Sequence, residues 1–72
     1  MKYERLTRIL RRKQVESITG LSRSTIYLRM KKGTFPKQIN IGLRSVGWLE
    51  YEIIEWMESC IQNRANAKSE IS

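Results

Sequence analysis

Hydrophobic and polar residues alternate along the chain with two different periods, one typical of helices and one typical of strands. The clearest helical segment is residues 51–63, where apolar side chains fall on one broad side and polar side chains on the other. The apolar side consists of Ile53, Ile54, Trp56, Met57, Cys60 and Ile61, and the polar side of Glu52, Glu55, Glu58 and Gln62. This pattern predicts a C-terminal helix that covers the core, with Cys60 buried as a small hydrophobic residue.

A short helix is predicted at residues 13–19, near the other end of the chain. Val15 and Ile18 lie three residues apart and should therefore share the buried face of its two turns. Just before it, residues 7–10 have the character of a short strand. The apolar anchors of this N-terminal segment are Leu6, Ile9 and Leu10.

A second short helix follows at residues 23–32, separated from the first by a tight turn. Gly20 suits the end of the first helix, because glycine adopts positive φ without steric cost. Ser22 suits the start of the second helix, where its hydroxyl can accept a hydrogen bond from a backbone amide two or three residues later. Ile26 and Met30 lie four apart and define the buried side. The segment therefore predicts a helix, a turn and a helix.

A β-hairpin is predicted after the second helix. Residues 37–41 and 45–49 alternate polar and apolar side chains, and residues 42–44, G-L-R, form the turn between them. The side chains predicted to point into the core from this region are Phe35, Ile39, Ile41, Val46 and Trp48. A short hairpin that follows a helix-turn-helix is a wing, and it must lie against a helix to be stable.

The formal charge of +7 is concentrated in the first two thirds of the 72-residue chain. Residues 1–49 carry twelve Lys and Arg against two Glu, whereas residues 50–72 carry two against five. A basic face on a small domain is typical of a protein that binds a polyanion, although solubility alone is an alternative interpretation. Binding to a membrane surface is less favoured, because it requires a basic face opposite an exposed apolar face on one helix.

The composition also argues against several kinds of site. The chain has no histidine, no aspartate and a single cysteine, so we expect no disulfide, no metal site and no cofactor. An enzyme acting on DNA is not expected, because a metal-dependent nuclease needs clustered carboxylates. A tyrosine recombinase would need an acid/base set around Tyr27 or Tyr51, and the sequence lacks one. No apolar stretch is long enough to span a bilayer, so a soluble protein is expected.

The second predicted helix carries the candidate residues for contact with DNA. Residues 23–32 contain no acidic side chain, as expected of a helix that enters the major groove. Arg23 and Thr25 are candidates for base readout, since arginine pairs with guanine and threonine contacts the thymine methyl group. Phosphate contacts are expected from Lys31, Lys32, Lys37 and Arg44, with the minor groove as an alternative for Arg44. The full candidate set is Ser22, Arg23, Ser24, Thr25, Tyr27, Lys31, Lys32, Lys37, Arg44 and Ser45.

Two further features bear on the nature of the ligand. Leu28 faces away from the expected core, so it either packs under a neighbouring loop, the favoured interpretation, or touches a thymine methyl group. RNA-binding sheets display stacked aromatic side chains, but only Tyr27 and Tyr3 are candidates for exposed aromatic residues here. The aromatic residues predicted to point inwards are Phe35, Trp48 and Trp56. Duplex DNA is therefore favoured over RNA.

Taken together, four segments resemble the AlpA family of prophage regulators, which have a MerR-like winged helix-turn-helix fold. The segments are R-I-L-R-R-K-Q-V, T-G-L-S-R-S-T-I-Y, G-T-F-P-K-Q-I-N-I-G and V-G-W-L-E-Y-E-I-I-E-W, and together they cover roughly residues 9–56. The fold expected is α+β and mainly α, with a short N-terminal strand, a two-helix helix-turn-helix, a hairpin wing and a C-terminal helix. We expect this domain to occupy residues 1–64, and the polar residues 65–72 to form a flexible tail.

The resemblance also implies a role in the biology of mobile elements. Family members bind double-stranded DNA near integrase genes or attachment sites, either as transcriptional regulators or as excisionase-like factors that bend DNA without catalysis. It implies a bacterial cytoplasmic location, close to the nucleoid, and assigns recognition-helix and wing roles to the candidate residues. Because a small monomer covers few base pairs, we expect weak self-association on repeated sites, or a partner such as integrase or RNA polymerase.

Overall fold

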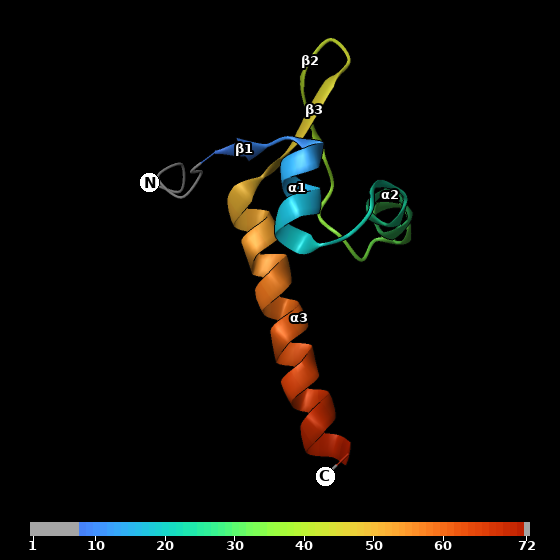
Figure 1. Ribbon diagram of the computed structural model, residues 1–72, viewed down its shortest axis with the longest axis vertical. Coiled ribbons are helices and arrows are strands. Elements are labelled where there is room, and N and C mark those ends of the chain that lie inside the picture. Colours follow the sequence, from blue (N-terminus) through green and yellow to red (C-terminus); the bar gives the residue numbers. More distant parts are fainter. Residues whose placement is uncertain (1–7, 72) are drawn as a thin grey trace.

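The chain folds into a three-stranded antiparallel sheet and three helices, in the order β1, α1, α2, β2, β3, α3 (Figure 1). A computed structural model describes residues 8–71, with side chains as far as residue 64. The elements are β1 (Ile9–Leu10), α1 (Arg12–Thr19), α2 (Arg23–Lys32), β2 (Ile39–Gly42), β3 (Ser45–Leu49) and α3 (Glu50–Ile71). The predicted fold class is confirmed, and every predicted element is present. Leu6, Thr7 and Tyr3, which were singled out in the sequence, lie outside the described residues.

The turn between α1 and α2 forms through the local signals that predicted it. Gly20 ends α1 in the left-handed conformation, with φ of 77°, and its N–H donates to the Glu16 carbonyl at 2.8 Å. The Ser22 hydroxyl accepts from the Thr25 N–H at 3.3 Å and so caps α2. Gly33 then ends α2 with φ of 79°. These caps fix the lengths of both helices and the turn that joins them.

The core receives one buried side chain from each helix, from β1 and β3, and from the loop after α2. These side chains are Leu10, Val15, Ile26, Phe35, Trp48 and Ile53. Trp48 lies on β3, the central strand in the order β1-β3-β2. Its indole N–H donates to the Pro36 carbonyl at 3.2 Å, and its ring meets the edge of Tyr27 at a centroid distance of 6.4 Å. Trp48 therefore joins the sheet to α2.

The C-terminal helix differs most from its prediction. Of its six apolar side chains only Ile53 is fully buried, while Trp56 and Met57 are partly buried and Ile54, Cys60 and Ile61 are exposed. The prediction that Cys60 is buried is thus wrong, because α3 extends away from the rest of the domain and only its first turns meet the core (Figure 1).

α3 also reaches Ile71 rather than ending near residue 63, since no glycine or proline follows residue 50 to interrupt it. The division of the chain after residue 64 stays a prediction. None of the described helices combines the length and the apolar character that a bilayer crossing requires.

Four smaller differences concern single apolar side chains. Ile18 on α1 and Ile41 on β2 are exposed, although both were predicted to point into the core, and Ile39 and Val46 are only half-buried. Among the described residues the buried core consists of six side chains with five more packed partly against it, and it is too small to cover these positions as well. The outer end of the wing consequently projects past the helices (Figure 1).

Gly47 has much closer neighbours than Gly42, the other glycine of the sheet, and alanine at Gly47 is expected to destabilise the domain. A Cβ atom at Gly47 would lie 2.4 Å from the Ile9 Cγ2 atom and 2.9 Å from the Leu10 carbonyl oxygen. Relieving this contact would require β1 to move away from β3, so we expect Gly47→Ala to lower the free energy of unfolding by about 1–3 kcal/mol. Chemical denaturation, monitored by circular dichroism, measures this loss of stability.

The matched control is Gly42→Ala, where the nearest atom would be the Ser45 Cβ at an ordinary 3.7 Å. This variant should unfold close to the wild-type midpoint. Equal midpoints for the two variants would contradict the close approach of β1 and β3 at Gly47.

Candidate nucleic-acid interface

α2 carries its polar side chains on the side away from Ile26, its one buried residue. At its first turn three hydroxyl groups lie together. The Ser22 Oγ donates to the Thr25 Oγ1 at 2.9 Å and lies 3.3 Å from the Ser24 Oγ. This network holds the start of α2 in a fixed conformation, with Ser22 and Ser24 exposed and Thr25 half-buried.

Arg23 and Tyr27 form a stack that leads from the surface to the core. The Arg23 guanidinium lies over the Tyr27 ring, with its carbon 5.9 Å from the ring centroid. Tyr27 in turn packs edge-on against the buried ring of Trp48, at an interplanar angle of 66°. Tyr27 is therefore half-buried, and not exposed as predicted. Its ring is well placed to orient Arg23, which remains exposed.

A basic groove of about 340 Å³ lies between α1, α2 and the wing, and we call it the wing groove. Its lining consists of Arg11, Arg12, Lys13, Tyr27, Arg44 and Val46. Arg12 forms an ion pair with Glu16 one turn along α1, whereas Arg11, Lys13 and Arg44 are exposed cations. Three basic side chains from the start of α1 thus face a fourth from the wing, a concentration of positive charge that suits a phosphate backbone.

The wing turn consists of Leu43 and Arg44, between the paired residues Gly42 and Ser45. Arg44 adopts φ of 60°, in the left-handed region that few residues other than glycine occupy. Leu43 is 93% exposed. Ser45 is half-buried beside them.

The remaining candidate residues do not line the wing groove. Lys31 and Lys32 are exposed in the last turn of α2. Lys37 is exposed, but it lines a different groove. Leu28 is 51% exposed, so the favoured interpretation that it packs under a loop is wrong, and its side chain is open to solvent.

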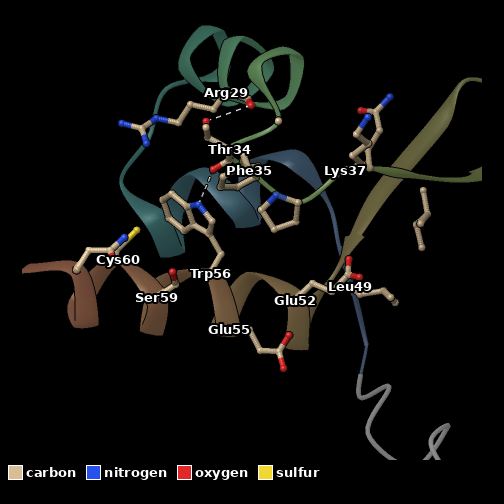
Figure 2. Close-up of a pocket in the computed structure, with 15 residues that line it drawn as sticks. Arg29, Thr34, Phe35, Lys37, Leu49, Glu52, Glu55, Trp56, Ser59 and Cys60 are labelled. Carbon is tan, nitrogen blue, oxygen red and sulfur yellow. Dashed lines mark hydrogen bonds between the residues drawn. The ribbon is translucent and has the colours of Figure 1, made fainter. Parts of the chain in front are cut away.

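The second groove, of about 890 Å³, lies between α3 and the loop after α2 (Figure 2). There the Trp56 indole N–H donates to the Thr34 carbonyl at 2.8 Å, and the Thr34 hydroxyl donates to the Arg29 carbonyl at 3.3 Å. Its charged residues are mixed in sign: Arg29, Lys37, Glu52 and Glu55. Since Arg29 and Tyr27 point about 200° apart on α2, this groove lies on the opposite flank from the wing groove.

Part of the site could be recognised from the sequence. Tyr27 and Arg44 belong to the candidate set named from the sequence, whereas Arg11, Arg12 and Lys13 do not. The clue was the uninterrupted run R-R-K at residues 11–13, directly before a helix. The wing groove brings Arg44 and Tyr27 together with this run, whereas Lys37 is not part of it.

A helix-turn-helix followed by a β-hairpin, with basic side chains on the face that both share, defines a winged helix-turn-helix domain. The family model described as Prophage CP4-57 regulatory protein (AlpA) matches residues 8–61. The chain belongs to this family, and the resemblance inferred from its sequence motifs is confirmed.

Two relatives show the same relationship. The chain is 46% identical over 57 residues to a protein of Enterobacteria phage P4 named Uncharacterized protein ORF88, an alignment covering 79% of this chain and 65% of the phage protein. It is 48% identical over 56 residues to the DNA-binding transcriptional activator AlpA of Escherichia coli (strain K12), covering 69% of this chain and 80% of the relative. The chain thus spans just under two thirds of the phage protein's length.

Proposed function

We propose that this protein binds double-stranded DNA sequence-specifically and regulates transcription in a prophage or integrative element. The observation that carries the proposal is the wing groove, which joins the α1 cations and Arg44 to the stack formed by Arg23 and Tyr27 on α2. The E. coli relative, named a DNA-binding transcriptional activator, supports the same conclusion. In the proposed complex α2 enters the major groove, and the wing lies on the backbone or in the adjacent minor groove.

Base readout is assigned to the first turn of α2. Arg23 is exposed there and rests on Tyr27, so its guanidinium is already partly oriented before binding. A bidentate pair between arginine and guanine contributes about 1–3 kcal/mol of discrimination. Thr25 is half-buried and engaged with Ser22, which leaves its methyl group as the better candidate for contact with a thymine. Leu28, exposed one turn further along α2, is a second candidate for such a contact.

Phosphate contacts are assigned to the exposed cations around α2 and the wing, which are Arg11, Lys13, Lys31, Lys32 and Arg44. Lys37 remains a candidate for a more distant phosphate. Contacts of this kind fix affinity and register but carry no sequence information. The function involves no catalytic step and takes place in the bacterial cytoplasm. A single small domain covers few base pairs, so several copies on repeated sites, or a partner such as integrase or RNA polymerase, complete the regulatory complex.

The test is selection of bound duplexes from a random pool. The wild-type protein should enrich one motif, and single-stranded RNA should compete poorly for binding to it. Arg23→Ala should relax the preference at one base pair, by roughly ten- to a hundredfold in relative affinity, because one bidentate contact is lost.

Arg29→Ala is the matched control, since Arg29 lies on the same helix but on the opposite flank. This variant should select the wild-type motif. A pool with no enriched motif would contradict the proposed function. Equal losses on cognate and random DNA for Arg23→Ala would remove Arg23 from base readout.

A further inference from the structure

Leu43 is the most exposed of the large hydrophobic side chains among the described residues, at 93%, followed by Ile61 at 58%. A single exposed leucine is ordinary on a protein surface and needs no explanation by itself. Leu43, however, lies in the turn of a hairpin that projects away from the described helices (Figure 1). Leu43 is therefore well placed to contact a partner molecule.

The backbone of this tip is held in one conformation. The Asn40 Oδ1 accepts from the Gly42 N–H at 3.0 Å on one strand, and the Ser45 hydroxyl donates to the Leu43 carbonyl at 3.5 Å on the other. Arg44 keeps φ of 60°, a conformation that glycine would adopt with less strain. The turn thus keeps a long cationic side chain next to Leu43 in spite of the backbone cost at Arg44, which indicates that this cation has a function.

The surroundings of the tip identify the chemistry of the partner. Arg44, the neighbour of Leu43 in the turn, lines the wing groove together with the basic residues at the start of α1, so a cationic surface begins beside the apolar tip. A protein partner would be met by a wider apolar patch, whereas Leu43 is flanked at the tip by Gly42 and Arg44. An apolar side chain beside an arginine matches the way proteins wedge open the minor groove, with arginine in the negative potential and the apolar group between bases.

We propose that Leu43 enters the minor groove next to the site read by α2, partly unstacks one base step and bends the duplex towards the major groove. This inference rests on the proposed function, because it assumes that the wing lies on DNA. Flexible pyrimidine–purine steps unstack most easily, so the wedge also selects TA or CA/TG at a position where no side chain reads a base edge. Leu43 is therefore a specificity-determining residue that acts through the shape of the DNA.

The experiment uses the full chain and the duplex that it selects, with 2-aminopurine placed in turn at each step on the wing side of the motif. Wild-type protein should raise the fluorescence at one step and bring the duplex ends closer in energy transfer between end labels. Leu43→Ser should abolish both signals and weaken binding about tenfold, since a leucine side chain is no longer buried. The loss should be smaller on a duplex with a mismatch at the wedged step, where unstacking is easier.

The matched control is Ile61→Ser, which removes another exposed apolar side chain far from the wing. It should leave fluorescence, bend and affinity unchanged. Unchanged binding and bend for Leu43→Ser would overturn the wedge while leaving the proposed function intact. A change in sedimentation of Leu43→Ser without DNA would also overturn it, in favour of a protein contact at the tip. Failure of the wild-type protein to bind any duplex would overturn the proposed function and the wedge together.

Discussion

Replacing Trp48 by alanine is expected to lower the free energy of unfolding by about 3–5 kcal/mol, the usual cost of removing a large buried aromatic side chain. Trp48 is the largest fully buried side chain of the described residues and lies on the central strand. At about 0.05–0.15 kcal/mol per residue, a chain of 72 residues has a free energy of unfolding of roughly 4–11 kcal/mol. The variant should therefore lose about half of its stability, and its Pro36 carbonyl would lose the indole donor.

Urea denaturation followed by far-ultraviolet circular dichroism measures this loss. Trp56→Ala is the matched control, because it removes the same side chain from a half-buried position on α3. The Trp56 ring packs edge-on against Phe35 at a centroid distance of 4.8 Å, and its indole N–H donates to the Thr34 carbonyl. Trp56→Ala should therefore lower the free energy of unfolding measurably, but by less than Trp48→Ala does. Equal losses for the two tryptophans would contradict the placement of the core around β3.

The Trp48 variant also tests the proposed DNA contact, because the same ring supports α2, the helix proposed to enter the major groove. Trp48 contacts Tyr27, and Tyr27 carries the Arg23 guanidinium. If Arg23 reads a base as proposed, stability and base readout are linked through the contacts of these three side chains. A replacement of Trp48 that leaves the protein folded should therefore make the orientation of the Arg23 side chain less fixed.

Much of the fold was predictable because its signals are local. The residues that end α1 and begin α2, Gly20 and Ser22, act through backbone conformation and a hydrogen bond within three residues. The sequence alone is enough to recognise signals of this kind. The extent of burial cannot be read in the same way. Periodicity places Ile18 and Cys60 on apolar faces, but it does not reveal that the small core does not extend to them.

The site was predictable only in part, for a related reason. The candidate residues on α2 follow from one helix and its charge pattern. The wing groove instead depends on pairing between β1 and β3, in which Leu10 lies opposite Trp48. This pairing brings the run at residues 11–13 against a wing that begins almost thirty residues later, and no local pattern of the sequence encodes such a contact. The half-burial of Tyr27 arises from the same strand order, because Trp48 is what covers it.

Removing two charges from the wing groove, with Arg11→Ala and Arg44→Ala combined, is expected to weaken binding to every duplex about a hundredfold or more at low salt. Each arginine is assigned one phosphate, and a hydrogen bond to a charged group contributes about 1.5–3 kcal/mol. Each lost contact should also reduce the slope of log affinity against log salt by about 0.9. The double variant should therefore show a slope smaller by about 2, with the preference for the selected motif unchanged.

Fluorescence anisotropy over a range of salt concentrations, on the selected duplex and on a random one, measures both quantities. The matched control combines Arg29→Ala with Arg64→Ala, which removes the same two charges from exposed positions outside the wing groove. If net charge alone attracted the DNA, the two double variants would lose equal affinity and equal slope. If the wing groove holds the backbone, only the first pair loses affinity and slope together, because counterions are released where phosphates are contacted.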